Sequence, residues 1–283
     1  MSSDRQPGDP LSVVVLGDST AFVDARGPQM PRAPHLYPNV MAAALERQLH
    51  RPVDVTVVAR PGQTVRDAAH AVTKDQHLQF DLLAHADAVV VGLGSFDHAP
   101  AGVPAAIEAT LPYLRPDQVR RRARAMSRAA YPGLVRLTGG RLRRTPAREF
   151  ERLFGQLLDH VRGLCWGRAA GVVLGPTSHR STYYGHVHPR FRAAEAHQLR
   201  LATEHGFAAV PAWDLVLPHA TALNVDGIHW PAPAHESVGN AVADALVVQL
   251  TGARPTVGLP PAYAAAIDAA RGANAAPDVP PNP

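Results

Sequence analysis

The sequence of 283 residues has a single cysteine, a single lysine and no long hydrophobic run. Because Cys165 stands alone, an internal disulfide bond and a metal site built from several thiolates are excluded, and a reducing compartment is indicated. No segment approaches the roughly 18 consecutive apolar residues of a membrane-spanning helix, and Met1–Pro10 lacks the apolar core of a signal peptide. We therefore expect a cytoplasmic protein without a membrane span, in which Cys165 serves packing.

Lysine is nearly absent, because Lys74 is the only lysine among the 28 Lys and Arg residues. The guanidinium group of arginine is a planar fork that suits carboxylates and phosphates. The net charge of +4 is unevenly distributed and the arginines are not interleaved with aromatic residues, as they are in proteins that bind single-stranded nucleic acid. The composition is therefore compatible with anionic small-molecule ligands and gives no sign of a nucleic-acid partner.

Short β-branched runs alternate along the chain with segments of helical spacing. Each run is nearly all apolar, which is typical of parallel strands that are covered by helices on both faces of a sheet. Thr64 is a suitable N-cap for the second helix. We expect strands at 11–16, 53–59, 88–93, 171–174 and 207–210, and helices at 40–49, 64–72, 191–205 and 240–250.

Two segments depart from this alternation. The first is an insertion at about 98–170, which we interpret as a helical cap over the carboxyl edge of the sheet within a catalytic domain spanning 11–251. Its arginines fit an anion-binding role and a solvated helix face equally well. The second is a Pro- and Ala-rich tail at 252–283, and residues 1–10 form a flexible N-terminus. The insertion carries Arg115, Arg120, Arg121, Arg122, Arg124, Arg128, Arg136, Arg141, Arg143, Arg144, Arg148 and Arg152, among other arginines.

A serine follows the first predicted strand directly, in Gly17–Thr20 (GDST), where a sharp turn exposes its hydroxyl. A nucleophilic serine needs a general base within hydrogen-bond reach and a third group that orients the base. Asp226 and His229, three residues apart in the segment DGIH, can reach one cleft from a single loop. The candidate catalytic triad is therefore Ser19, His229 and Asp226, and the backbone N–H of Ser19 can face a developing oxyanion.

These segments resemble the first and last conserved blocks of the GDSL/SGNH hydrolase superfamily, which are a strand ending in Gly-Asp-Ser and an Asp-x-x-His before a terminal helix. Gly62 follows the second predicted strand, where the family places an oxyanion-binding glycine N–H. The order of the blocks covers roughly residues 11–250. The resemblance implies a three-layer α/β/α, flavodoxin-like fold with a parallel sheet of about five strands, and serine-dependent acyl chemistry that needs neither a metal nor another cofactor.

The third block of the family is not matched. The family has Gly-x-Asn-Asp, whose asparagine amide donates to the oxyanion, whereas Gly94–Asp97 reads GSFD. Phe96 cannot donate a hydrogen bond, and losing one such donor costs about 10²–10³ in kcat. Three interpretations stay open: the N–H groups of Ser19 and Gly62 suffice, Ser95 replaces the amide, or the protein is weakly active.

Several polar residues near the expected carboxyl edge are further candidates. We expect Asp18 to brace the nucleophile turn and Asp97 to bind nearby backbone N–H groups. The residues after the fourth strand line the acceptor side of the cleft or form an ordinary polar loop. His186 and His188 alternate as metal ligands on a strand would, but no carboxylate is near them in sequence, and we expect no metal. The candidate substrate-binding residues are Asp18, Ser95, Phe96, His179, Arg180, Tyr183 and Tyr184.

An acyl-serine can be discharged by water or by an alcohol with the same triad. The arginine-rich insertion suits substrates with phosphates or a carboxylate, so we expect an acyltransferase that takes an acyl-CoA as co-substrate and a polyol acid as acceptor. The alternatives are a carboxylesterase, a carbohydrate deacetylase and, because of Phe96, an inactive ligand-binding domain. The sequence does not indicate an oligomeric state.

Overall fold

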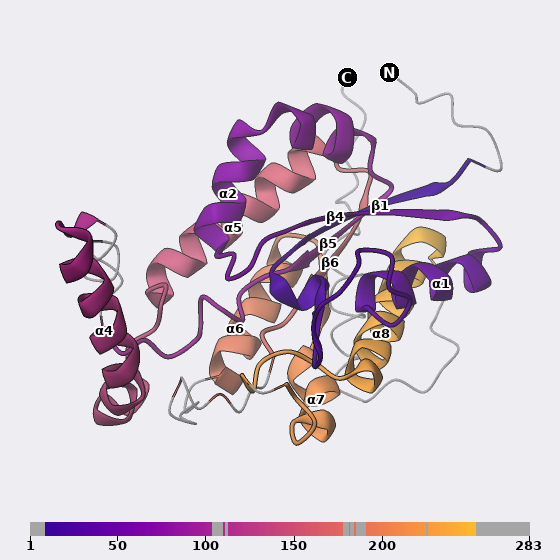
Figure 1. Ribbon diagram of the computed structural model, residues 1–283. Coiled ribbons are helices and arrows are strands. Elements are labelled where there is room, and N and C mark those ends of the chain that lie inside the picture. The colour runs from indigo at the N-terminus through magenta and orange to yellow at the C-terminus, as the bar shows by residue number, and fades with distance from the viewer. Residues whose placement is uncertain are drawn as a thin grey trace, which may run out of the picture.

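The computed structural model describes residues 9–103, 110, 113–177, 181, 184, 191–224 and 226–252. Its centre is a five-stranded parallel sheet in the order β4-β1-β5-β6-β7 (Figure 1). This is the strand order of doubly wound, flavodoxin-like proteins. The predicted α/β fold with five parallel strands is confirmed. The strands are β1 (Leu11–Gly17), β4 (Val53–Ala59), β5 (Ala88–Gly92), β6 (Ala170–Leu174) and β7 (Ala208–Val210).

The sheet is buried on both faces, which explains why its strands are almost continuously apolar. Successive side chains of a strand point to opposite faces. In β1, Val13 and Val15 belong to one core cluster, and Val14 and Leu16 belong to the other. β1 pairs with β4 on one side and with β5 on the other, so it lies in the interior of the sheet and delivers the chain to the middle of the carboxyl edge.

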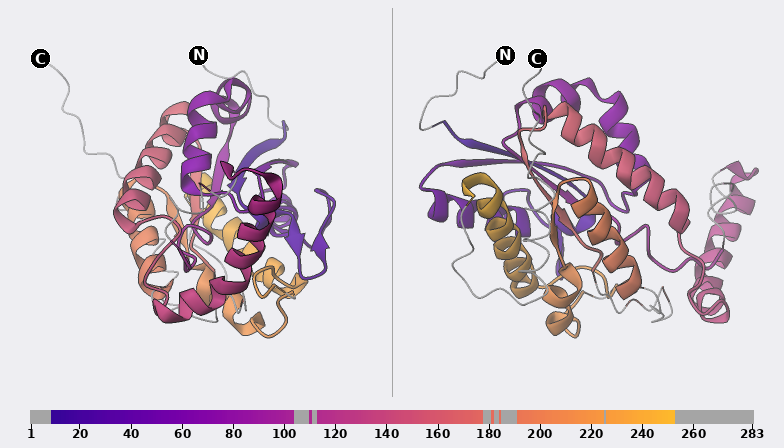
Figure 2. Two further views of the ribbon diagram at one scale, coloured as in Figure 1. Left: turned by 60° about the vertical axis from the view of Figure 1, so that its left-hand side comes forward. Right: turned by 180° about the vertical axis from the view of Figure 1, so that it is seen from behind.

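Helices cover the two faces as separate layers (Figures 1 and 2). Buried residues of α1 and α8 pack on one face in the first cluster. Buried residues of α2, α5 and α6 pack on the other face in the second cluster. The helices are α1 (Tyr37–Leu49), α2 (Val65–Lys74), α4 (Asp117–Leu137), α5 (Ala147–Leu164), α6 (Phe191–Glu204), α7 (Ala212–Val216) and α8 (Ala232–Thr251). The shorter elements are β2 (Val23–Asp24), β3 (Gly27–Pro28), η1 (Ser19–Ala21), η2 (His77–Leu82), η3 (Leu83–His85) and η5 (Leu217–His219).

The long insertion divides into two helices with different surroundings. Figure 1 shows α4 apart from the helices that cover the sheet, on the side where the strands end. In contrast, α5 packs against α2, and its buried residues, Phe150 and Phe154 among them, belong to the second core cluster. The interpretation of the whole insertion as a cap is therefore wrong for α5, which is one of the covering helices of the sheet.

No helix in the described part of the chain is long and apolar enough to cross a membrane. The Pro- and Ala-rich tail beyond Gly252 and the first eight residues lie outside the described residues.

Candidate active site

The candidate nucleophile, Ser19, is the first residue of the short helix η1, directly after β1. The Asp18 carboxylate holds this turn, because it accepts hydrogen bonds from the N–H of Thr20 at 2.9 Å and from the Thr20 hydroxyl at 2.7 Å. Asp18 is only 4% exposed, and its burial raises the pKa of the carboxyl group. The assignment of Asp18 to substrate binding is therefore corrected: its side chain faces the turn and positions Ser19.

The structure brings Ser19, His229 and Asp226 together in one hydrogen-bonded chain. His229 Nε2 lies 2.9 Å from Ser19 Oγ, and His229 Nδ1 lies 2.8 Å from Asp226 Oδ2. Partial burial tends to raise the pKa of the Asp226 carboxyl group. Hydrogen bonds from Asn224, Ile228 and His229 and the charge of His229 together outweigh burial, so the pKa lies below its ordinary value. An ionised carboxylate only accepts hydrogen bonds, so the His229 proton resides on Nδ1 and Nε2 faces the serine hydroxyl as an acceptor.

A residue that the sequence analysis missed, Asn224, organises the loop that carries the histidine. Its Oδ1 accepts hydrogen bonds from the N–H groups of Ile228 at 3.3 Å and His229 at 3.1 Å. Gly227 in the same loop has a φ of 72°, which glycine adopts without strain. Asparagine side chains often bind backbone N–H groups a few residues ahead, so an Asn shortly before Asp-x-x-His was the available signal.

Gly62, the candidate oxyanion glycine, lies directly against Phe96. A Cβ atom on Gly62 would stand 3.2 Å from a Phe96 ring carbon, and its φ of +63° also favours glycine. The Ser95 oxygen accepts a hydrogen bond from the N–H of Thr177 at 3.1 Å, which leaves its O–H available to donate. This contact joins the loops after β5 and β6. The backbone N–H groups of Ser19 and Gly62 and the Ser95 hydroxyl are therefore the candidate oxyanion donors.

Asp97 fastens the third block to two other segments. Its carboxylate accepts hydrogen bonds from the N–H of Val65 at 3.0 Å and from the Thr145 hydroxyl at 2.6 Å. Asp97 is fully buried, and burial raises the pKa of its carboxyl group to about 6. The contact with Val65 is the backbone N–H bond that the sequence led us to expect. The contact with Thr145 holds the link between α4 and α5, and no sequence pattern indicated it.

Tyr184, one of the candidate substrate-binding residues, is buried in a small cluster with residues of α4. It is 4% exposed and packs edge-on against Tyr131 of α4, with ring centroids 6.3 Å apart, and Ile228 packs against the same cluster. The prediction that Tyr184 lines the substrate cleft is corrected, because its ring is buried in this packing. The other candidates from the same loop, His179, Arg180, Tyr183, His186 and His188, lie outside the described residues.

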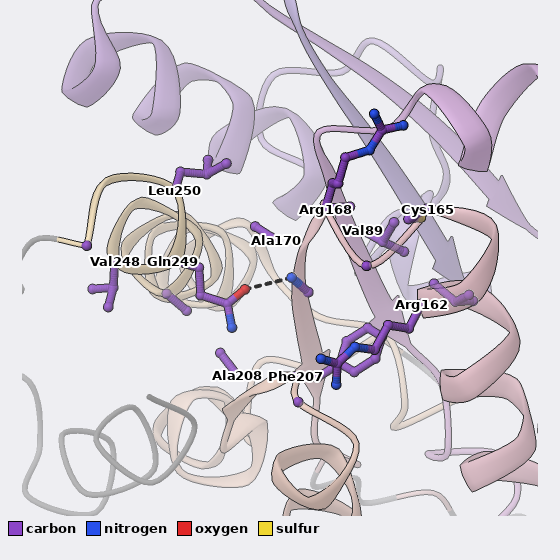
Figure 3. A pocket seen from close by; sticks show the side chains of 17 residues that line it. Val89, Arg162, Cys165, Arg168, Ala170, Phe207, Ala208, Val248, Gln249 and Leu250 are labelled. Atoms are coloured by element: carbon purple, nitrogen blue, oxygen red, sulfur yellow. Dashed lines mark hydrogen bonds between the residues drawn. The ribbon is translucent and has the colours of Figure 1, made fainter. Parts of the chain in front are cut away.

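A separate cavity of about 520 Å³ lies at the opposite edge of the sheet (Figure 3). It is lined by residues that begin β6 and β7, such as Ala170 and Ala208, and by Cys165 after α5. Cys165 is buried, and burial raises the pKa of its thiol to about 11, so the thiol is unreactive packing. This cavity is therefore no part of the candidate active site. Among the described residues, no group of three His, Cys, Asp or Glu side chains is placed to hold a metal ion.

Comparison with known proteins places this geometry in context. Residues 15–236 match the GDSL-like Lipase/Acylhydrolase family. The matched segment includes Ser19, Gly62, Asp226 and His229, so the hydrogen-bonded chain lies inside it.

Two curated relatives share a name and match over most of their length. The diglucosylglycerate octanoyltransferase of Mycolicibacterium hassiacum is 28% identical over 252 residues, which cover 86% of this chain and 96% of that protein. The diglucosylglycerate octanoyltransferase of Mycobacterium tuberculosis is 28% identical over 254 residues, which cover 87% of this chain and 95% of that protein.

A solved structure, the lipase Lip_vut3 from a goat rumen metagenome, is similar with a TM-score of 0.54 at 13% identity, covering 81% of this chain and 94% of that one. This likeness supports the fold alone.

Proposed function

Because the chain belongs to the GDSL-like lipase/acylhydrolase family, we propose that it is an acyltransferase that moves an octanoyl group from a CoA thioester to a hydroxyl of diglucosylglycerate. The two relatives that bear this activity in their names support the acyl group and the acceptor. The observation that carries the catalytic part is the chain of hydrogen bonds from Ser19 through His229 to Asp226. A CoA thioester donor would place the reaction in the cytoplasm.

In the first half-reaction, Ser19 Oγ attacks the thioester carbonyl carbon while His229 Nε2 accepts the hydroxyl proton. The tetrahedral oxyanion is stabilised by the N–H groups of Ser19 and Gly62. When the carbon–sulfur bond breaks, His229 returns the proton to the departing thiolate, and free CoA and an octanoyl-serine remain. Asp226 keeps the imidazole oriented and stabilises its charged form throughout. These side chains handle every proton, so the reaction needs no other cofactor.

In the second half-reaction, a hydroxyl of the acceptor takes the place of CoA. His229 Nε2 accepts its proton while its oxygen attacks the octanoyl carbonyl, and the proton then returns to Ser19 Oγ as the new ester leaves. The acceptor competes with water, which is far more concentrated. The bound acceptor reacts faster than water because it is held close to the ester carbonyl, and well-oriented groups reach effective molarities of about 10⁵–10⁸ M.

Intact-protein mass spectrometry after incubation with octanoyl-CoA tests this proposal. We expect one added octanoyl group on the wild-type chain and none on the Ser19→Ala variant. Added diglucosylglycerate should remove the group and carry it into the product, accelerating CoA release. Rapid release of octanoate that no acceptor accelerates or diverts would instead establish a carboxylesterase. Activity on acetylated glycans alone would establish a deacetylase, and the absence of any acyl-enzyme with any ester would establish an inactive binding domain.

A further inference from the structure

The link between α4 and α5 is fixed against the loop after β5, which carries the third block of the family. Thr145 donates to Asp97 through its hydroxyl and again through its N–H, which lies 3.0 Å from the Asp97 carbonyl oxygen. The N–H of the preceding residue, Arg144, donates to the carbonyl of Ala99 at 3.2 Å. The backbone of Arg144 is therefore held in place, and its side chain projects from a defined position.

The guanidinium group of Arg144 lies over the aromatic face of Phe96. Its Cζ is 4.2 Å from the ring centroid, within the range of a cation–π interaction. The same ring touches Gly62 with its edge. Phe96 stands where the family has its asparagine, so at this position an amide donor is replaced by an apolar face that supports a guanidinium group next to the oxyanion glycine.

A second contact joins Arg144 to the cluster that contains Tyr131. Its Nη2 donates to the Tyr131 hydroxyl at 3.3 Å. Tyr131 packs with Tyr184 and Ile228, and Ile228 directly precedes His229 in the chain. Arg144 therefore contacts both the ring that touches Gly62 and the cluster against which Ile228 packs, and it is only partly buried.

We propose that the Arg144 guanidinium, supported by Phe96 and Tyr131, binds the carboxylate of the acceptor and so selects a glycoside of an acid over a neutral glycoside. This inference rests on the proposed function. A guanidinium fork pairs with a carboxylate through two parallel hydrogen bonds, which also fixes its orientation. The phosphates of a CoA thioester are separated from the acyl group by the long pantetheine arm. A cation on the ring that touches Gly62 therefore suits the acceptor, and the exposed arginines of α4 are left for the donor phosphates.

Calorimetric binding of two probes to the full-length protein tests the inference without requiring turnover. The probes are glucosylglycerate and glucosylglycerol, which differ in having a carboxylate or a hydroxymethyl group. We expect the wild-type protein to prefer glucosylglycerate. The Arg144→Gln variant should lose about 10- to 100-fold in affinity for glucosylglycerate, the range expected when charged hydrogen bonds are removed. Its affinity for glucosylglycerol should stay within about threefold, since that probe makes no charged hydrogen bond with Arg144.

Two further variants serve as matched comparisons. Arg141→Gln removes the same charge from an exposed neighbour in the same segment and should leave the preference intact. Arg144→Lys keeps the charge without the fork and should recover only part of the preference. Thermal unfolding checks that each variant is folded.

Equal affinity of the wild-type protein for both probes would overturn the inference, as would an equal loss for both probes in Arg144→Gln. Octanoyl transfer measured on the same samples reports on the proposed function separately. Selective, Arg144-dependent binding of glucosylglycerate without any transfer would leave the carboxylate site standing and remove the transferase.

Discussion

Replacing Asp226 with asparagine is expected to move the imidazole proton of His229 from Nδ1 to Nε2 while leaving the loop folded. Asp226 Oδ1 accepts a hydrogen bond from the N–H of Ile228 at 2.8 Å, and Oδ2 faces His229 Nδ1 at 2.8 Å. In the Asp226→Asn variant, the amide oxygen is retained at the position that faces the Ile228 N–H, because only an acceptor is satisfied there. The NH₂ group then faces His229 Nδ1 and forces the imidazole proton onto Nε2.

The size of the loss follows from this reversal. With a proton on Nε2, the imidazole can no longer accept the proton of Ser19 Oγ, which lies 2.9 Å away. The same replacement in a serine protease triad lowers kcat by about 10⁴. At about 1.4 kcal/mol for each factor of ten, this corresponds to about 5 kcal/mol of lost transition-state stabilisation.

Pre-steady-state release of CoA from octanoyl-CoA measures the acylation step directly. Asp214→Asn is the matched control, because Asp214 is a surface carboxylate that pairs with Arg192 away from the triad. We expect the control to acylate at the wild-type rate and both variants to unfold at wild-type temperatures. An acylation rate of Asp226→Asn within tenfold of the wild type would refute the argument that the carboxylate sets the imidazole tautomer.

Three further predictions concern other parts of the site. Ser19→Ala should abolish acyl transfer without lowering the unfolding temperature, and near-normal turnover would contradict its role. Arg121 and Arg122 of α4 are exposed, and changing both to Ala should raise KM for octanoyl-CoA more than KM for an uncharged nitrophenyl octanoate. The difference between the two donors should shrink as the salt concentration rises. Equal effects on both donors would show that the two arginines belong to a solvated surface. Because burial raises the pKa of Asp97 from 3.8 to about 6, the folded state binds an extra proton between these values. The free energy of unfolding of the wild type should therefore fall by about 2 kcal/mol from pH 4 to pH 6 relative to Asp97→Asn, and urea titrations that show a constant difference would contradict this.

The sheet was predictable because its strands carry a clear signal. The strand Val53–Ala59 has the predicted bounds, and the other strands differ from prediction by one residue at an end. The helix α2 was equally clear, because Thr64 caps it in a reciprocal capping box with Asp67.

Two helix starts were predicted too late. α1 begins at Tyr37 and α8 at Ala232, three and eight residues before the predicted starts at 40 and 240. Both helices have a proline in the first turn. A proline there lacks only an N–H group that has no partner in the helix anyway, so it begins a helix where in the interior it would break one.

The insertion shows where local pattern stops being informative. Its many arginines led us to expect one cap along its whole length, yet α5 covers the sheet and α4 lies apart from it. The apolar residues that bury α5, such as Phe150 and Phe154, stand at helical spacing. An arginine-rich composition masked that spacing when the segment was interpreted as a single unit.

In the third block, Phe96 and Asp97 are neighbours in the sequence but contact different parts of the fold. Asp97 connects the start of α2 to the link between α4 and α5 through a buried carboxylate, and these contacts do not involve the side chain before it. Phe96 instead faces Gly62 and Arg144, which lie 34 and 48 positions away in the sequence. The effect of the substitution is therefore decided by long-range neighbours. The local motif shows that the amide donor is missing, whereas the contact between the Phe96 ring and the Arg144 guanidinium group becomes visible only in the fold.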